Sequence, residues 1–171
     1  MPEFLTDLHY PRNPDPPRLF LYYASRLEAL IRELRSRAGA SQATLHGATH
    51  EAVQYVRELL AHVTAASGNI SFPEIDLLRR YHLDSYSVAE EVESVHHTVL
   101  SSRAFLLTMP AFLSDATALA PPDDGLVQDL KACVRGMCAA ITEVDRAVEP
   151  TERVSVAAYL ALLGAGDNQP S

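Results

Sequence analysis

The feature that most constrains the fold is a helix–turn–helix pattern that occurs twice in the chain. Residues 55–81 read YVRELLAHVTAASGNISFPEIDLLRRY, and residues 133–159 read CVRGMCAAITEVDRAVEPTERVSVAAY. An ungapped alignment of the two segments gives the identical pairs Val56/Val134, Arg57/Arg135, Ala61/Ala139, Thr64/Thr142, Glu74/Glu152 and Tyr81/Tyr159. Each copy predicts an amphipathic helix, a tight turn, a buried aliphatic residue and a capped second helix. Because a helical hairpin cannot bury its apolar face alone, the pattern predicts that the two units pack together.

The rest of the chain predicts helices as well, so the expected fold class is all-α. Apolar residues recur at helical spacing between residues 18 and 38, and no useful length of sequence alternates polar and apolar residues with period two. We expect a compact bundle of about six to seven helices built around the two hairpins. The predicted parts, in chain order, are a proline-rich arm at 1–17, a helix at 18–38, the first hairpin at 50–81, connecting helices at 88–120, the second hairpin at 126–163 and a flexible tail or linker at 164–171.

Capping residues set most of the predicted helix boundaries. In a Ser-x-x-Glu capping box the hydroxyl accepts from the Glu amide, and the carboxylate reaches back to the Ser amide. Proline fits the first helical position, because its missing N–H would have no helical partner there. The predicted capping residues are Ser71, Glu74, Ser87, Glu90, Pro150 and Glu152. We expect the second helix to begin near Thr49, because Gly47 interrupts it. The helix after Ser87 is expected to continue through Leu107.

The amino-acid composition indicates a folded domain and disfavours nucleic-acid-binding and transmembrane proteins. Of the 171 residues, 47% are hydrophobic and 21% are charged, which predicts a folded domain. The net charge of -8 disfavours a nucleic-acid partner, because duplex binding depends on clustered positive charge. No apolar run approaches the ~20 residues that span a bilayer, so we expect a cytoplasmic protein without a transmembrane segment. Cys133 and Cys138 are expected to be buried thiols, since they provide no disulfide framework.

The turns of the two copies resemble those of the TerB-like tellurite-resistance domains, in which Asp-Gly-x-hydrophobic-x-x-x-Glu follows an Ala-rich helix and occurs twice. Residues 67–74 keep the Gly, the aliphatic residue and the Glu of this pattern, but Ser67 replaces the Asp. Residues 145–152 keep the Asp, the aliphatic residue and the Glu, but Arg146 replaces the Gly. The resemblance covers residues 50–163 and leaves the first helix outside it.

This resemblance implies a compact helical bundle without known catalysis, of a kind found in bacterial stress-response and defence gene neighbourhoods. TerB-like regions also occur fused to other modules, including AAA+ ATPases. We therefore expect a non-enzymatic protein-interaction or regulatory module of a bacterial stress-response or anti-phage (antiviral) defence system, or the N-terminal domain of a longer protein of that kind. Its expected partner is another protein, such as an ATPase or effector that is encoded nearby or fused in cis.

A divalent-metal-binding sensor is the alternative function. Some TerB-like proteins bind divalent metal through acidic turn residues, and a hard cation requires several oxygen ligands at close range. The candidate ligands are Asp145, Glu149, Glu152 and Glu74. Helix capping is the competing role for Glu74 and Glu152. The sequence predicts no cofactor other than this metal.

Other sequence motifs that could form a metal or catalytic site are incomplete in this chain. Glu93 and His96 form an E-x-x-H unit, but a di-iron bundle needs a second such unit on another helix. His46 and His50 have the spacing of a zinc pair, without an obvious third ligand. The chain lacks a nucleophile elbow, a phosphate loop, a dinucleotide fingerprint and a C-x-x-C motif. We therefore expect no catalytic residues.

The first helix has a local excess of positive charge on an otherwise acidic protein. Its arginines are Arg18, Arg26, Arg32, Arg35 and Arg37. They are interpreted either as solvated charges interleaved with Glu28 and Glu33, or as a docking surface for an acidic partner. On the second interpretation, alanine at Arg32 and Arg35 weakens partner capture with little effect on thermal stability. Tyr22 broadens the apolar coverage of the helix, which favours contact with the proline-rich arm or with a second copy in a homodimer.

Overall fold

The fold is helical throughout the part of the chain that the structure describes. The computed structural model describes residues 10–12, 15–39, 41–66, 68, 70–82, 87–121, 124–144 and 150–164. Its elements are α1 (Pro16–Arg37), α2 (Gln42–Ala65), α3 (Phe72–His82), α4 (Val88–Ser101), the short 3-10 helix η2 (Phe105–Leu107), α5 (Ala111–Leu119), α6 (Leu126–Val144) and α7 (Pro150–Leu162). These residues include no strand, which confirms the all-α class. Within the same ranges, no helix has the length and apolar character to cross a membrane.

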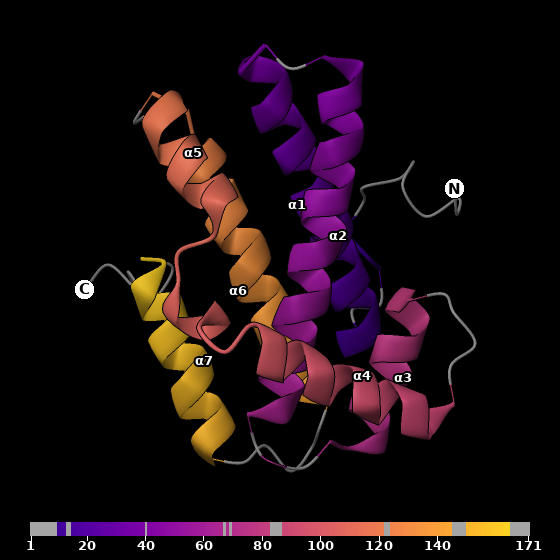
Figure 1. Ribbon diagram of the computed structural model, residues 1–171. Helices are drawn as coiled ribbons and strands as arrows, with labels where there is room; N and C mark the ends of the chain where they lie inside the picture. Colours follow the sequence, from indigo (N-terminus) through magenta and orange to yellow (C-terminus); the bar gives the residue numbers. More distant parts are fainter. Residues whose placement is uncertain are drawn as a thin grey trace.

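Three long helices form the centre of the bundle (Figure 1). α1 packs along α6 in the broadest helix–helix contact of the structure, and it also packs on α2. α3 and α4 lie beside each other and pack on α2, whereas α5 and α7 pack on α6. The two segments with the repeated pattern touch through α2 and α6, through α2 and α7, and through α3 and α6. The central role of α1, which lies outside the repeated pattern, was not predicted from the sequence.

Regular apolar spacing explains why α1 occupies the centre. Phe20, Leu27 and Ile31 are fully buried and follow the spacing that places side chains on one helix face. They belong to one continuous core cluster with side chains of α2 and α6. Cys133 and Cys138 are buried in this cluster as free thiols, as the sequence predicted. Burial of such apolar surface is the main favourable term in folding.

A glycine allows α1 and α6 to approach closely. The ring of Tyr23 lies over Gly136, and a Cβ atom added at Gly136 would lie 2.6 Å from Tyr23 Cζ and closer still to two other ring carbons. Tyr23 also meets Tyr22 edge-on, and Tyr22 in turn meets Tyr10 of the N-terminal arm at a centroid distance of 5.5 Å. The expected contact between the arm and the first helix is therefore present at Tyr10.

The predicted helix caps are largely present. The carboxylate of Asp15 accepts from the Arg18 amide and caps α1. Ser87 and Glu90 form the complete capping box of α4. Before α3, the amide and the hydroxyl of Ser71 both donate to the Glu74 carboxylate, at 2.7 Å and 2.9 Å. Pro150 is the first residue of α7, as predicted, and Glu152 is its third, while the residues before Pro150 lie outside the described ranges and the capping role of Glu152 stays a prediction.

Two predicted helix boundaries are wrong. α2 begins at Gln42 and runs through Gly47 without a break, since a helix interior tolerates glycine at a cost of about 1 kcal/mol. α4 ends at Ser101 instead of continuing through Leu107. The hydroxyls of Ser101 and Ser102 both donate to the Thr98 carbonyl, and such local bonds compete with helix continuation.

Replacement of Gly136 by alanine tests the close approach of α1 and α6. We expect Gly136→Ala to lower the free energy of unfolding by about 1–3 kcal/mol, because the new methyl group overlaps the Tyr23 ring. Urea denaturation measures this change. Gly47→Ala is the matched control: no atom lies within 4 Å of its added Cβ, so a gain of up to about 1 kcal/mol is expected from helix propensity. Equal effects at the two glycines would contradict the packing.

Candidate functional site

An open groove lies between α2 and the segment that connects α4 to α5. Its volume is about 680 Å³, which is within the range of ligand and peptide sites. The lining residues are His50, Glu51, Gln54, Tyr55 and Glu58 on α2, and Ser101–Phe105 and Thr108–Phe112 on the connecting side. No motif in the sequence had indicated this groove.

One face of α2 forms the first wall. His50, Gln54 and Glu58 are spaced four residues apart, so they follow one another along a single side of the helix. This wall is about 12 Å long, since each helical residue advances 1.5 Å. Gln54 donates to Glu58 at 2.8 Å, which orients the carboxylate along the wall.

The connecting segment forms the second wall because α4 stops early. After Ser101 the chain turns through η2, and Pro110 precedes the first residue of α5. This short path leaves apolar side chains in solvent: Leu107 is 78% exposed and Met109 is 38% exposed. Met109 lines the groove, and Leu107 stands in sequence between the lining residues Phe105 and Thr108. Exposed apolar side chains that cluster beside a groove are typical of binding surfaces.

Packed aromatic rings form the floor of the groove. Tyr55 meets Phe112 edge-on at a centroid distance of 4.9 Å and Phe105 at 5.4 Å. The hydroxyls of Tyr55 and Tyr159 are hydrogen-bonded at 2.8 Å, a contact that joins α2 to α7. Burial raises the pKa of both phenols, and the proximity of the two hydroxyls further raises that of Tyr55. Both phenols are therefore protonated at neutral pH.

His62 fixes η2 against α2. The single hydroxyl proton of Ser102 goes to the Thr98 carbonyl at 2.8 Å, so Ser102 Oγ accepts from His62 Nε2–H at 3.0 Å. The His62 ring also stacks on Phe105 at a centroid distance of 5.0 Å and an angle of 10°. Burial lowers the pKa of His62 from 6.5, although nearby Glu58 opposes the shift. The neutral Nε2–H form therefore holds the second wall in place at neutral pH.

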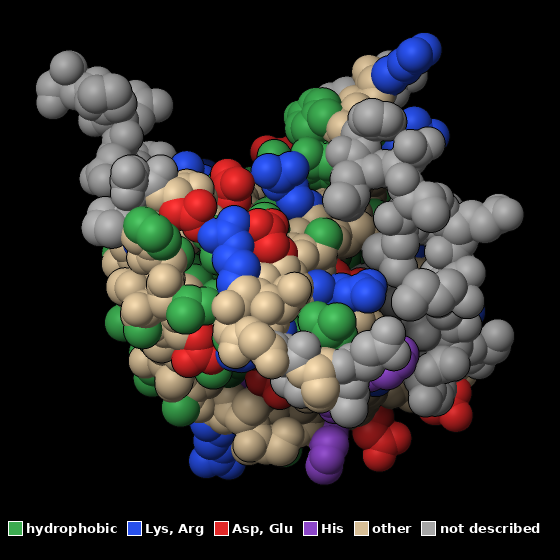
Figure 2. All heavy atoms as spheres, turned by 90° about the horizontal axis from the view of Figure 1, so that it is seen from above, with side chains coloured by type: hydrophobic (Ala, Val, Ile, Leu, Met, Phe, Trp, Pro, Cys, Tyr) green, Lys and Arg blue, Asp and Glu red, His purple; other side chains and the backbone are tan. Residues whose placement is uncertain are grey.

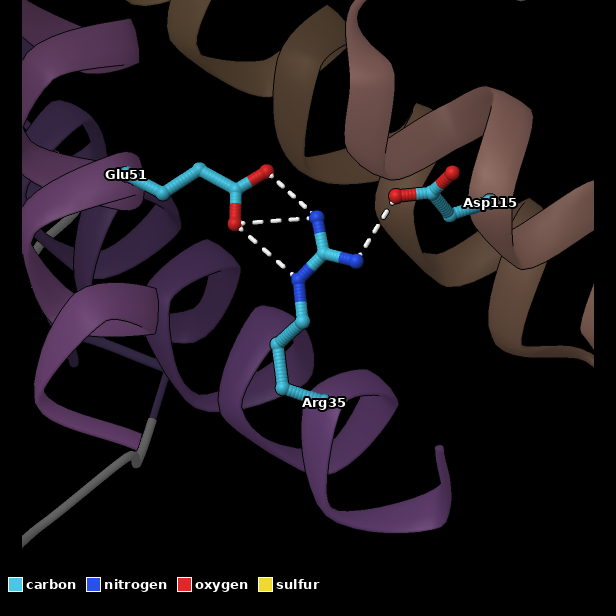
Figure 3. A network of polar contacts seen from close by, with 3 residues as sticks. All are labelled: Arg35, Glu51 and Asp115. Carbon is cyan, nitrogen blue, oxygen red and sulfur yellow. Dashed lines mark hydrogen bonds and ion pairs between the residues drawn. The ribbon is translucent and has the colours of Figure 1, made fainter. Parts of the chain in front are cut away.

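Arg35 joins three helices beside the groove, through contacts to the lining residue Glu51 and to Asp115 (Figure 3). Its Nε and Nη2 atoms donate to both oxygens of Glu51 on α2, at 2.8–3.1 Å. Its Nη1 atom donates to Asp115 on α5 at 2.7 Å. These bonds raise the pKa of Arg35 above its ordinary value, Glu51 being the main contributor. A guanidinium from α1 thus holds α2 and α5 at a fixed separation.

Most of the arginine face of α1 is engaged within the chain. Arg18 lies 3.5 Å from Asp15, Arg26 lies 3.7 Å from Asp129, and Arg37 pairs with Glu33 and Asp124. Seen from the end of the bundle where α1 finishes, blue and red side chains alternate over the surface (Figure 2). Arg32 is the exception, since it is exposed and has no ion-pair partner among the described residues. The face is therefore poorly suited to act as one continuous positive docking surface.

The candidate metal ligands fall into two groups. Glu74 and Glu152 are fully buried near the starts of α3 and α7. Asp145 and Glu149 lie outside the described residues. Across the ranges that are described, no three His, Cys, Asp or Glu side chains gather as a metal site would require. The metal site remains a prediction from the turn motif.

The two histidine motifs also remain without further ligands in the described ranges. His46 and His50 lie one turn apart on α2, both exposed. Glu93 and His96 are exposed on α4. These placements are ordinary for polar residues on helix surfaces.

Comparison with known proteins gives no relative: no family model matches the sequence, and no curated protein or solved structure matches it. The resemblance to TerB-like domains therefore rests on the two turn motifs and their helical context.

Substitution of Arg35 tests the contribution of its ion pairs to stability. We expect Arg35→Ala to lower the free energy of unfolding by about 1–3 kcal/mol, because Glu51 and Asp115 lose their shared charged donor. The docking interpretation of the sequence, by contrast, predicted that alanine at Arg35 would have little effect on thermal stability. Arg32→Ala removes the same charge from the same helix without breaking an ion pair among the described residues, and it should change the stability by less than about 0.5 kcal/mol. Chemical denaturation of both variants gives their free energies of unfolding, and equal effects would contradict a stabilising role of the Arg35 ion pairs.

The stability should depend on pH through His62. Because burial lowers its folded-state pKa, the stabilisation is fully present above pH 6.5 and is lost as the pH falls from 6.5 towards the lower folded value. Melting temperatures measured between about pH 5 and pH 7.5 should therefore fall on acidification. His62→Phe keeps an aromatic ring beside Phe105 and removes the titrating group, so its profile should be flatter in this range. An unchanged slope in the variant would exclude His62 as the source.

Proposed function

We propose that this chain is a non-enzymatic helical module that binds another protein through the groove beside α2. The observation that carries the proposal is a groove of about 680 Å³ with an aromatic floor and a second wall that presents the exposed apolar side chain of Met109. Two of its lining residues are held by side chains outside the groove, Glu51 by Arg35 and Ser102 by His62. A preformed apolar groove lowers the entropy cost of binding, because little has to be ordered on association.

The protonation states of the nucleophilic side chains support a binding role over catalysis. Burial raises the pKa of Cys133 to about 12 and that of Cys138 to about 12, so both remain thiols. Tyr55 and Tyr159 remain phenols for the same reason. An activated nucleophile requires the opposite shift.

Equivalent contacts in the two halves support membership of the TerB-like class. Thr64 donates to the Ala61 carbonyl at 3.0 Å, and Thr142 donates to the Ala139 carbonyl at 2.9 Å. Buried positions also coincide, at the pairs Val56/Val134, Leu59/Met137, Leu60/Cys138, Val63/Ile141 and Glu74/Glu152. We further propose, from the resemblance to TerB-like domains, that the module acts in a bacterial stress-response or anti-phage pathway, with an ATPase or effector encoded nearby or fused in cis as its partner.

Direct binding to neighbouring gene products tests the proposal. The full chain and each protein encoded beside its gene, including any downstream part of the same reading frame, are purified and mixed in pairs. Isothermal calorimetry should detect a complex with at least one of them. Met109→Asp should weaken that complex by about tenfold or more, since it places a charge on the apolar wall.

Leu162→Asp provides the matched control. Leu162 is 44% exposed on α7 and does not line the groove, so this variant introduces the same charge elsewhere. It should bind like the wild type. Absence of any complex would contradict the proposed function, and equal weakening by both variants would contradict the groove as its site.

A further inference from the structure

Each wall of the groove carries one charged side chain that forms no ion pair with the described part of the chain. The two charges are opposite in sign. Glu58 on α2 accepts from the neutral amide of Gln54 and takes part in no ion pair among the described residues. Arg103 on the second wall is exposed and likewise forms no ion pair within those ranges. Glu51, by contrast, is neutralised by Arg35. The charges that remain for a partner are therefore negative on the α2 side and positive on the other.

The dimensions and lining of the groove select the shape of an occupant. The α2 wall extends over two helical turns, or about 12 Å. Phe105 and Met109 offer apolar surface within the same groove. A short amphipathic helix presents an apolar stripe with polar residues on both edges, and such helices bind in apolar grooves through residues one turn apart.

We propose that the groove binds a short amphipathic helix of the partner protein, with Lys or Arg on the edge that faces Glu58 and Asp or Glu on the edge that faces Arg103. The inference rests on the proposed function and names the chemistry of the partner segment. Its apolar stripe lies on Phe105 and Met109 between the two charges. Because the walls differ in sign, the charges fix the direction of the bound helix as well as its identity.

A displayed peptide library tests this chemistry without knowledge of the partner. The probe is a library of 14-residue helical peptides with leucines fixed on one face and all flanking positions randomised. Selection on the wild-type chain should enrich Lys and Arg on one edge and Asp and Glu on the other. Selection on Glu58→Lys should deplete Lys and Arg at the enriched positions and favour acidic residues there.

Glu93→Lys is the control for a change of charge outside the groove, since Glu93 is exposed on α4. It should leave the enrichment unchanged. For one selected peptide, fluorescence anisotropy should give at least tenfold weaker binding to Glu58→Lys and to Met109→Asp, and unchanged binding to Glu93→Lys. Circular dichroism establishes that each variant is folded.

Three results would overturn the inference: no enrichment of any peptide, enrichment that ignores the charge at Glu58, or binding that Met109→Asp does not weaken. If a neighbouring protein still binds the chain and Met109→Asp still weakens that complex, the proposed function stands and only the helical, charge-flanked partner segment is excluded. If no neighbouring protein binds while the peptides do, the groove recognises this chemistry and the assignment of the partner is wrong.

Discussion

The packing of α1 against both α2 and α6 is the interaction on which the rest of the structure depends. Tyr23 meets Gly136 at the α1–α6 contact, and the apolar face of α1 completes the core. The same helix ends beside the groove, where Arg35 reaches between α2 and α5. One helix thus determines the core and the separation of two elements at the groove. A loss of its packing would affect stability and binding together.

The second wall of the groove is held by side chains that also belong to the core. Phe105 lies within ring-contact distance of Tyr55, His62 and Tyr159, which come from α2 and α7. These contacts join η2 to two helices and so anchor the connecting segment on the core. Met109 and Arg103 are therefore presented from a supported backbone, which favours a preformed binding surface.

Local features of the sequence predicted much of the fold. The cap at Ser87, the start of α7 at Pro150 and the helical spacing of α1 follow from interactions within one or two turns. The groove could not be predicted in this way. It depends on how the segment after α4 packs against α2, more than 40 residues away in sequence, and on the end of α4 at Ser101. Counting charges on α1 identified its arginines, but their partners on α2, α5 and α6 are set by the tertiary fold.

The most direct test of the central claim is to map where a bound protein partner contacts the chain. Amide chemical shifts of the isotope-labelled chain, recorded with and without the partner, provide that map. The account predicts that the largest changes cluster on residues 50–58 and 101–112, on the two walls of the groove. A cluster around Arg32 on the exposed face of α1, with the groove unchanged, would contradict it.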